Sequence, residues 1–142
     1  MKWIQASKPG DILGVFHLLE GDETREVVRY NPLLQSVRIS SGNEHRLFFI
    51  KPAGAGKRFR FTNEYGFAVG KLILSDADAG EGTVEVGKHG FHYRLFRDPA
   101  PELAIYTPLQ LLPALTCQLL QWRKETLQEY AVLLLGLCYL IR

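Results

Sequence analysis

The chain has 142 residues, 46% of them apolar, and its 17 basic and 15 acidic side chains leave a formal charge of +2. That length is typical of a single domain, and a chain of this size can bury enough surface to fold without metal or disulfide staples. The charged fraction of 23% and the aromatic fraction of 11% exclude a disordered or collagen-like chain. A charge this small gives no reason to expect nucleic acid as a partner.

Residues 11–106 consist of short apolar or alternating runs separated by turn residues. In the run Arg58–Thr62, for example, Phe59 and Phe61 alternate with polar side chains, which is typical of a half-buried strand. Turn signals recur about every ten residues and no helical period interrupts them, so an antiparallel sandwich or barrel is favoured over a parallel βαβ fold. The predicted strands are Ile12–Leu18, Arg25–Tyr30, Gln35–Ser40, His45–Lys51, Arg58–Thr62, Phe67–Leu74, Thr83–Val86, Phe91–Arg97 and Leu103–Tyr106.

After Thr107 the pattern becomes helix-like. The segment Thr107–Gln110 has a capping hydroxyl, a proline at the first helical position and Gln at the third, which predicts the start of a helix. Pro113 should kink or delay that helix, because its ring clashes with the carbonyl four residues back. A second capping box, Thr126–Glu129, predicts the start of another helix. The first of these helices carries an apolar stripe made of Leu112, Leu115, Leu119 and Trp122.

The last run, Tyr130–Ile141, is apolar on every side, which a surface helix is not. It is shorter than the ~20 residues that a membrane span needs, so we expect protein around it on all sides. We therefore predict one domain over residues 1–142: an antiparallel β-barrel, with strands over about 11–106, around a buried hydrophobic C-terminal helical segment over about 108–142. Two alternatives stay open, namely a helix pressed between a sheet and a dimer partner, and a truncated membrane anchor.

The two cysteines, Cys117 and Cys138, lie among apolar residues and are predicted to be reduced, buried and inert. If one helix held both, they would be ~30 Å apart, far beyond the ~7 Å between Cα atoms that a disulfide allows. The first ten residues lack the apolar core of a secretory signal. These features predict a cytoplasmic protein, with peripheral membrane association as an option.

The order of elements in the second half of the chain resembles that of a known family. Arg58–Lys71 reads as strand, turn and strand, and Gly82–Val86 and Phe91–Leu95 lead to Leu103–Tyr106 and the apolar helix. This order, from about residue 58 to residue 141, resembles the second half of the tubby C-terminal-like superfamily, which includes tubby proteins, phospholipid scramblases and LURP-one-related proteins. The resemblance implies a closed barrel of about a dozen strands around a hydrophobic C-terminal helix. We count fewer strands, so either the barrel is smaller or strands are missing from the prediction.

Motifs that would indicate an enzyme, a cofactor or a metal are incomplete. Gly82–Lys88 fits a phosphate-binding loop, except that His89 replaces the Ser or Thr that would hold magnesium. Asp76–Glu81 has acidic spacing like that of a calcium loop, but it lacks the later ligands. His89 and His92 lack a third zinc ligand near them in the sequence, and there is no nucleophile elbow. We therefore expect no catalytic residue, no metal and no cofactor, and hence a non-enzymatic protein.

The remaining functional feature is a group of cations, Lys51, Lys57, Arg58 and Arg60, in a stretch without acidic residues. If Phe59 and Phe61 fill the barrel, the two arginines project together into solvent, where they can hold a phosphate. The loop Gly54–Gly56 could add backbone N–H donors.

Tubby proteins bind phosphoinositide headgroups through basic residues, so the resemblance makes this group the candidate site for an anionic headgroup. The expected partner is an anionic membrane surface or a phosphate-bearing ligand. A lipocalin-like barrel with a small apolar ligand and a protein-interaction scaffold without ligand are the alternatives. The sequence leaves the oligomeric state open.

Overall fold

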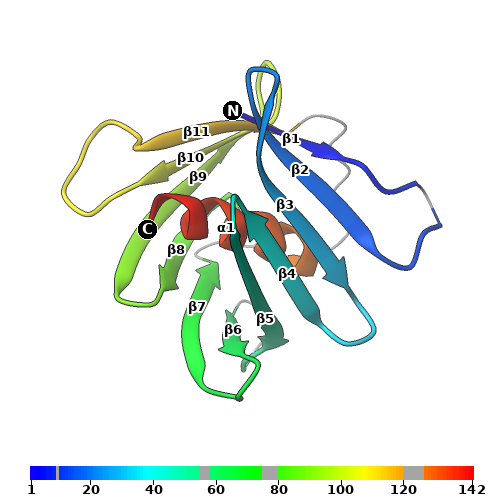
Figure 1. Cartoon of the computed structure of the whole chain (residues 1–142). Helices are drawn as coiled ribbons and strands as arrows, with labels where there is room; N and C mark the ends of the chain where they lie inside the picture. The colour runs from blue at the N-terminus through cyan, green and yellow to red at the C-terminus, as the bar shows by residue number, and fades with distance from the viewer. Residues whose placement is uncertain (9, 55–57, 75–79, 120–126) are drawn as a thin grey trace.

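The computed structural model describes residues 1–8, 10–54, 58–74, 80–119 and 127–142. In these residues eleven strands form one closed barrel and a single helix follows them (Figure 1). The prediction of a mainly β chain with a closed barrel and a C-terminal helix is confirmed. The elements are β1 Lys2–Gln5, β2 Gly14–Glu20, β3 Glu23–Asn31, β4 Ser36–Ser41, β5 Glu44–Pro52, β6 Arg58–Asn63, β7 Ala68–Leu74, β8 Glu81–Val86, β9 His89–Phe96, β10 Glu102–Tyr106, β11 Leu115–Leu119 and α1 Leu127–Ile141.

Neighbouring strands from β1 to β11 pair in antiparallel fashion in chain order, which is the simplest way to close a barrel from hairpins. The closing pair is different, because β1 lies parallel to β11, with Lys2 opposite Gln118 and Trp3 opposite Leu119. Successive strands run in opposite directions, so the connections between them alternate between the two ends of the barrel. One end carries the connections β1–β2, β3–β4, β5–β6, β7–β8 and β9–β10. The β2–β3, β4–β5, β6–β7, β8–β9 and β10–β11 connections lie at the other end.

Two of these strands were not predicted. The first, β1, has only four residues, too few for a recognisable alternation, and it is defined by its partners β2 and β11. The second, β11, lies where the sequence predicted part of a helix beginning after Thr107. The helix prediction is wrong for the described residues, because no helix lies between residues 107 and 119. Trp122 and Thr126 lie outside the described residues.

The error at β11 has a physical cause. The spacing of four between Leu115 and Leu119 fits one face of a helix, but it also fits one face of a strand, where every second residue points inward. In the structure Cys117 and Leu119 are buried while Thr116 and Gln118 are exposed, so the period is two. Pairing with β10 satisfies the backbone of this segment, and a proline at position 113 could not have continued a helical hydrogen-bond ladder.

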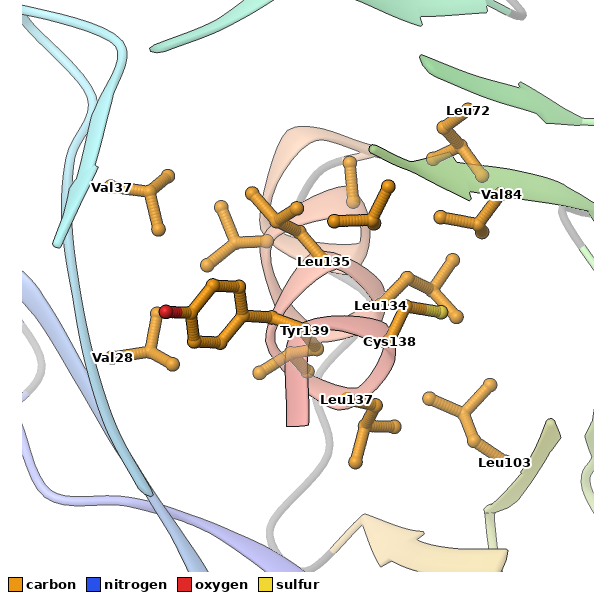
Figure 2. Close-up of a cluster of buried hydrophobic side chains, with 14 of the residues drawn as sticks. Val28, Val37, Leu72, Val84, Leu103, Leu134, Leu135, Leu137, Cys138 and Tyr139 are labelled. Atoms are coloured by element: carbon orange, nitrogen blue, oxygen red, sulfur yellow. The ribbon is translucent and has the colours of Figure 1, made fainter. Parts of the chain in front are cut away.

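The helix α1 carries the most continuous run of buried residues in the described chain, with all nine residues from Ala131 to Tyr139 buried. Their side chains leave the helix in several directions and meet wall residues such as Val28, Val37, Leu72, Val84 and Leu103 (Figure 2). One hydrophobic core thus contains both helix and wall side chains. No helix in the described part of the chain is both long and apolar enough to cross a membrane.

The C-terminal end of α1 is tied to the start of β5. The hydroxyl of Tyr139 donates a hydrogen bond to Glu44 Oε2 at 2.8 Å, and Arg142 Nη1 donates one to the carbonyl of Tyr139 at 2.9 Å. The guanidinium of Arg142 also lies over the Tyr139 ring, 3.7 Å from its centroid. Arg142 also forms an ion pair with Glu44 at 3.8 Å, so both residues at this end of the helix are joined to β5 through Glu44.

Both thiols are free and buried, as predicted, and we expect them to be unreactive in the folded protein. Burial raises the pKa of Cys117 to about 12 and also raises the pKa of Cys138, so neither forms much of the reactive thiolate. A thiol reagent should therefore label native protein slowly, even at mildly alkaline pH, whereas denatured protein should give two equivalents. Rapid labelling of either cysteine in native protein would contradict the placement of β11 or α1.

Candidate functional site

The predicted cations that the structure describes lie on the outer face of two adjacent strands. Lys51 on β5 and Arg60 on β6 are directly opposite one another in the register, which places their Cβ atoms about 5 Å apart. Arg58 lies two residues from Arg60 on the same face, roughly 7 Å along the strand. All three side chains are exposed, while Phe59 and Phe61 are buried in the core, as the alternation predicted.

The pairing of β6 with β7 adds a cation that the sequence reasoning missed. Lys71 lies opposite Arg60 on the side away from Lys51. Its ammonium is 3.9 Å from the carboxylate of Glu85, with both side chains about half exposed, so this ion pair is weak. We refer to Lys51, Arg58, Arg60 and Lys71 as the cationic cluster. Lys57 and residues 55 and 56 of the glycine loop lie outside the described residues.

Three of the four side chains in the cationic cluster lack compensating charge. None of the ion pairs in the described part of the chain involves Lys51, Arg58 or Arg60. Like charges placed directly opposite on neighbouring strands repel one another, so this arrangement stabilises nothing in the fold. An anion bound over the cluster would remove the repulsion, and a guanidinium can hold a phosphate with two parallel hydrogen bonds.

A second basic group, also missed, lies on β3, β4 and β5. Arg29 and Arg38 are opposite one another, and with His45 and Arg46 they line a depression of about 530 Å³. Glu64 lines the same depression. Its carboxylate repels an anion, so this group is the weaker candidate of the two.

A buried carboxyl is the third feature that the sequence reasoning did not single out. Glu26 on β3 is 1% exposed, and neither of its carboxyl oxygens has a hydrogen-bond partner among the described residues. The indole nitrogen of Trp3 on β1 is likewise buried without a partner among them. The helix passes close to both residues at Gly136, where an added Cβ would lie 2.7 Å from Glu26 Oε1. Burial raises the pKa of Glu26 to about 9, so this carboxyl is neutral at pH 7.

The remaining sequence motifs are the phosphate-loop-like segment, the two neighbouring histidines and the segment with calcium-loop spacing. The interior of Gly82–Lys88 belongs to strand β8, as the alternation predicted, and does not lead from a strand into a helix. His89 and His92 are exposed on β9, and no group of three or more potential metal ligands occurs in the part of the chain that the structure describes. Most of Asp76–Glu81 lies outside the described residues.

Comparison of the chain with protein-family models, with curated proteins and with solved structures found no match. The function is therefore inferred from the geometry and chemistry of this chain.

Proposed function

We propose that this protein is a non-enzymatic, tubby-like barrel that binds an anionic headgroup at the cationic cluster. The observation that carries the proposal is the shared exposed face of Lys51, Arg58 and Arg60, none of which is in an ion pair among the described residues. Arginine guanidinium groups match the geometry of a phosphate, and the lysines add positive charge around it. A cluster of this kind on a surface strand suits a headgroup presented by a membrane.

The family assignment is part of the same proposal. It is supported by the closed barrel, by the strand order from Arg58 to Tyr106, and by the apolar helix α1 that follows. The burial of Ala131–Tyr139 and the shared core of helix and wall are in keeping with a barrel built around its C-terminal helix.

The two rival functions make different demands on the molecule. A lipocalin-like barrel needs an empty lumen for its ligand, and here side chains of α1 such as Leu134 and Leu137 pack among the wall residues. A protein-interaction scaffold needs no cationic site and should not bind vesicles. The vesicle-binding experiment below therefore distinguishes it from a headgroup-binding protein.

We expect the double substitution Arg58→Ala/Arg60→Ala to remove most binding to vesicles that contain anionic lipid. Binding by the unaltered protein should weaken as salt is added, because exposed charges are screened beyond ~8 Å at physiological ionic strength. The melting temperature should hardly change, since exposed charges contribute little to folding. Arg58→Lys/Arg60→Lys should restore binding only in part, because an ammonium cannot make the two-pronged contact. Vesicle co-sedimentation and thermal denaturation measure these effects.

The matched control is Arg25→Ala/Lys88→Ala, which removes two exposed cations from elsewhere on the barrel and produces the same net charge. It should bind nearly as well as the unaltered protein. Equal loss in both double variants would mean that net charge alone governs binding and that the cationic cluster is not a site. Equal binding to neutral and anionic vesicles would contradict the proposed function, as would binding neither to vesicles nor to a soluble anionic headgroup.

A further inference from the structure

Two leucines are held in solvent at one end of the barrel. Leu33 is 79% exposed and Leu34 is 65% exposed, and both lie in the turn between β3 and β4, which we call the leucine turn. The side-chain oxygen of Asn31 accepts hydrogen bonds from the backbone N–H groups of Leu33 at 3.0 Å and Leu34 at 3.3 Å. Gln35 ends the turn in the left-handed conformation, with φ of 55°. The turn therefore presents both leucines from a hydrogen-bonded backbone rather than from an unstructured loop.

The leucine turn lies beside the cationic cluster. The backbone N–H of Ile50 donates a 2.9 Å hydrogen bond to the carbonyl of Gln35, which places the turn next to Lys51 and hence next to Arg60 across the following strand pair. The β3–β4 turn, drawn in cyan, and the far end of β5 reach the same end of the barrel (Figure 1).

More apolar surface adjoins this turn. Ile12 and Leu13 are exposed immediately before Gly14, which pairs with Tyr30 at the end of β3. The same end of the molecule thus carries an apolar rim and, beside it, cations without ion pairs.

We infer that this end of the barrel docks on a lipid bilayer: Leu33 and Leu34 enter the boundary of the hydrocarbon layer while the cationic cluster holds the phosphates of anionic lipids. The inference rests on the proposed function and adds to it that apolar side chains of the leucine turn enter the bilayer that presents the headgroup. A soluble phosphate can use only the cations. A bilayer offers both phosphate and hydrocarbon within one surface, which matches an exposed apolar pair with positive charge beside it.

The chain provides a matched control. Leu109 and Leu111 are almost fully exposed in the β10–β11 connection, which lies at the opposite end of the barrel from the leucine turn. Substitution there removes the same kind of surface without touching the proposed docking end.

The test compares Leu33→Ser/Leu34→Ser with Leu109→Ser/Leu111→Ser on vesicles of phosphatidylcholine and phosphatidylserine in equal parts. We expect the first variant to partition onto vesicles about tenfold or more weakly than the unaltered protein, because two large apolar side chains no longer leave water. The control variant should bind as the unaltered protein does. Both should retain its affinity for glycerophosphoserine, a soluble headgroup that the cations alone can hold.

A second measurement reports insertion directly. Cys117 and Cys138 are buried, so an environment-sensitive fluorophore attached to Leu34→Cys labels that site selectively. Its emission should shift to the blue on anionic vesicles, while the same label on Leu111→Cys should not respond. An unshifted label at position 34, or undiminished vesicle binding by Leu33→Ser/Leu34→Ser, would overturn bilayer docking at the leucine turn.

The two proposals fail in distinguishable ways. Loss of binding in Arg58→Ala/Arg60→Ala, together with undiminished binding in Leu33→Ser/Leu34→Ser, overturns the docking inference and supports the headgroup site. Loss in the leucine variant alone overturns the headgroup site and supports insertion. If the unaltered protein binds no vesicles, glycerophosphoserine separates the cases: binding of the soluble headgroup overturns docking only, and its absence overturns both.

Discussion

Replacing Leu134 by Asp is expected to abolish soluble expression of this protein. The side chain of Leu134 is completely buried on α1 and lies among leucines and valines (Figure 2). The substitution places a carboxyl in this apolar core and leaves a cavity, which together cost several kcal/mol. Against a total free energy of unfolding of about 5–15 kcal/mol, that cost leaves little folded protein. The yield of soluble protein, relative to that of the unaltered chain, measures the effect.

Leu109→Asp is the matched control, because Leu109 is fully exposed and the same change there should leave yield and melting temperature nearly unaltered. A truncation after Glu129 removes most of α1 and should be as damaging as Leu134→Asp. A truncated chain that stayed monomeric, soluble and cooperatively folded would show that the helix is not required for the barrel.

Replacing Glu26 by Gln is expected to stabilise the protein by about 3 kcal/mol at pH 7. Burial raises the pKa of Glu26 from 4.5 to about 9, so folding at pH 7 requires a carboxylate that is ionised in the unfolded chain to take up a proton. Each pH unit above the ordinary pKa costs about 1.4 kcal/mol until the pKa of the folded state is reached. Glutamine has nearly the same shape and no proton to gain, so this cost disappears.

The sign of the effect follows from the direction of the shift. Below pH 4.5 the carboxyl is protonated in both the folded and the unfolded state, and the two proteins should be about equally stable. As pH rises from 4.5 toward 9, the unaltered protein should lose stability relative to Glu26→Gln, and the difference should level off above pH 9. Urea denaturation at several pH values measures this difference.

Glu23→Gln, at an exposed position of the same strand, is the control and should change stability little. A Glu26→Gln variant no more stable than the unaltered protein at pH 7 would mean that the carboxyl is paired or hydrated in solution.

Alternation along single strands carried most of the fold prediction. Phe59 and Phe61 facing inward, with Arg58 and Arg60 outward, follow directly from a period of two, and α1 follows from its uniformly apolar sequence. The segment Leu115–Leu119 could not be assigned in this way, because its spacing fits both periods and its structure depends on pairing with β10. Secondary structure that depends on a distant partner is not contained in the local pattern.

The candidate site was only partly predictable for the same reason. Lys51, Arg58 and Arg60 are close in sequence, so a hairpin brings them together, whereas Lys71 joins them only through the register of β6 with β7. Glu26 could have been found, since it alternates with Val28 and Tyr30 on the inward face of β3. The leucine turn could not, because exposure of an apolar pair depends on the whole fold.

Because β1 pairs with β11, the barrel cannot close until nearly the whole chain has been synthesised. Lys2 and its partner Gln118 are 118 − 2 = 116 residues apart in the chain. At about 5–20 residues per second, a ribosome needs roughly 6 to 23 s after it has made β1 to reach the end of β11. Throughout that interval the nascent sheet has an open edge at β1, which another unfinished chain can occupy. We therefore expect misassembly between unfinished chains to be most frequent before β11 is made.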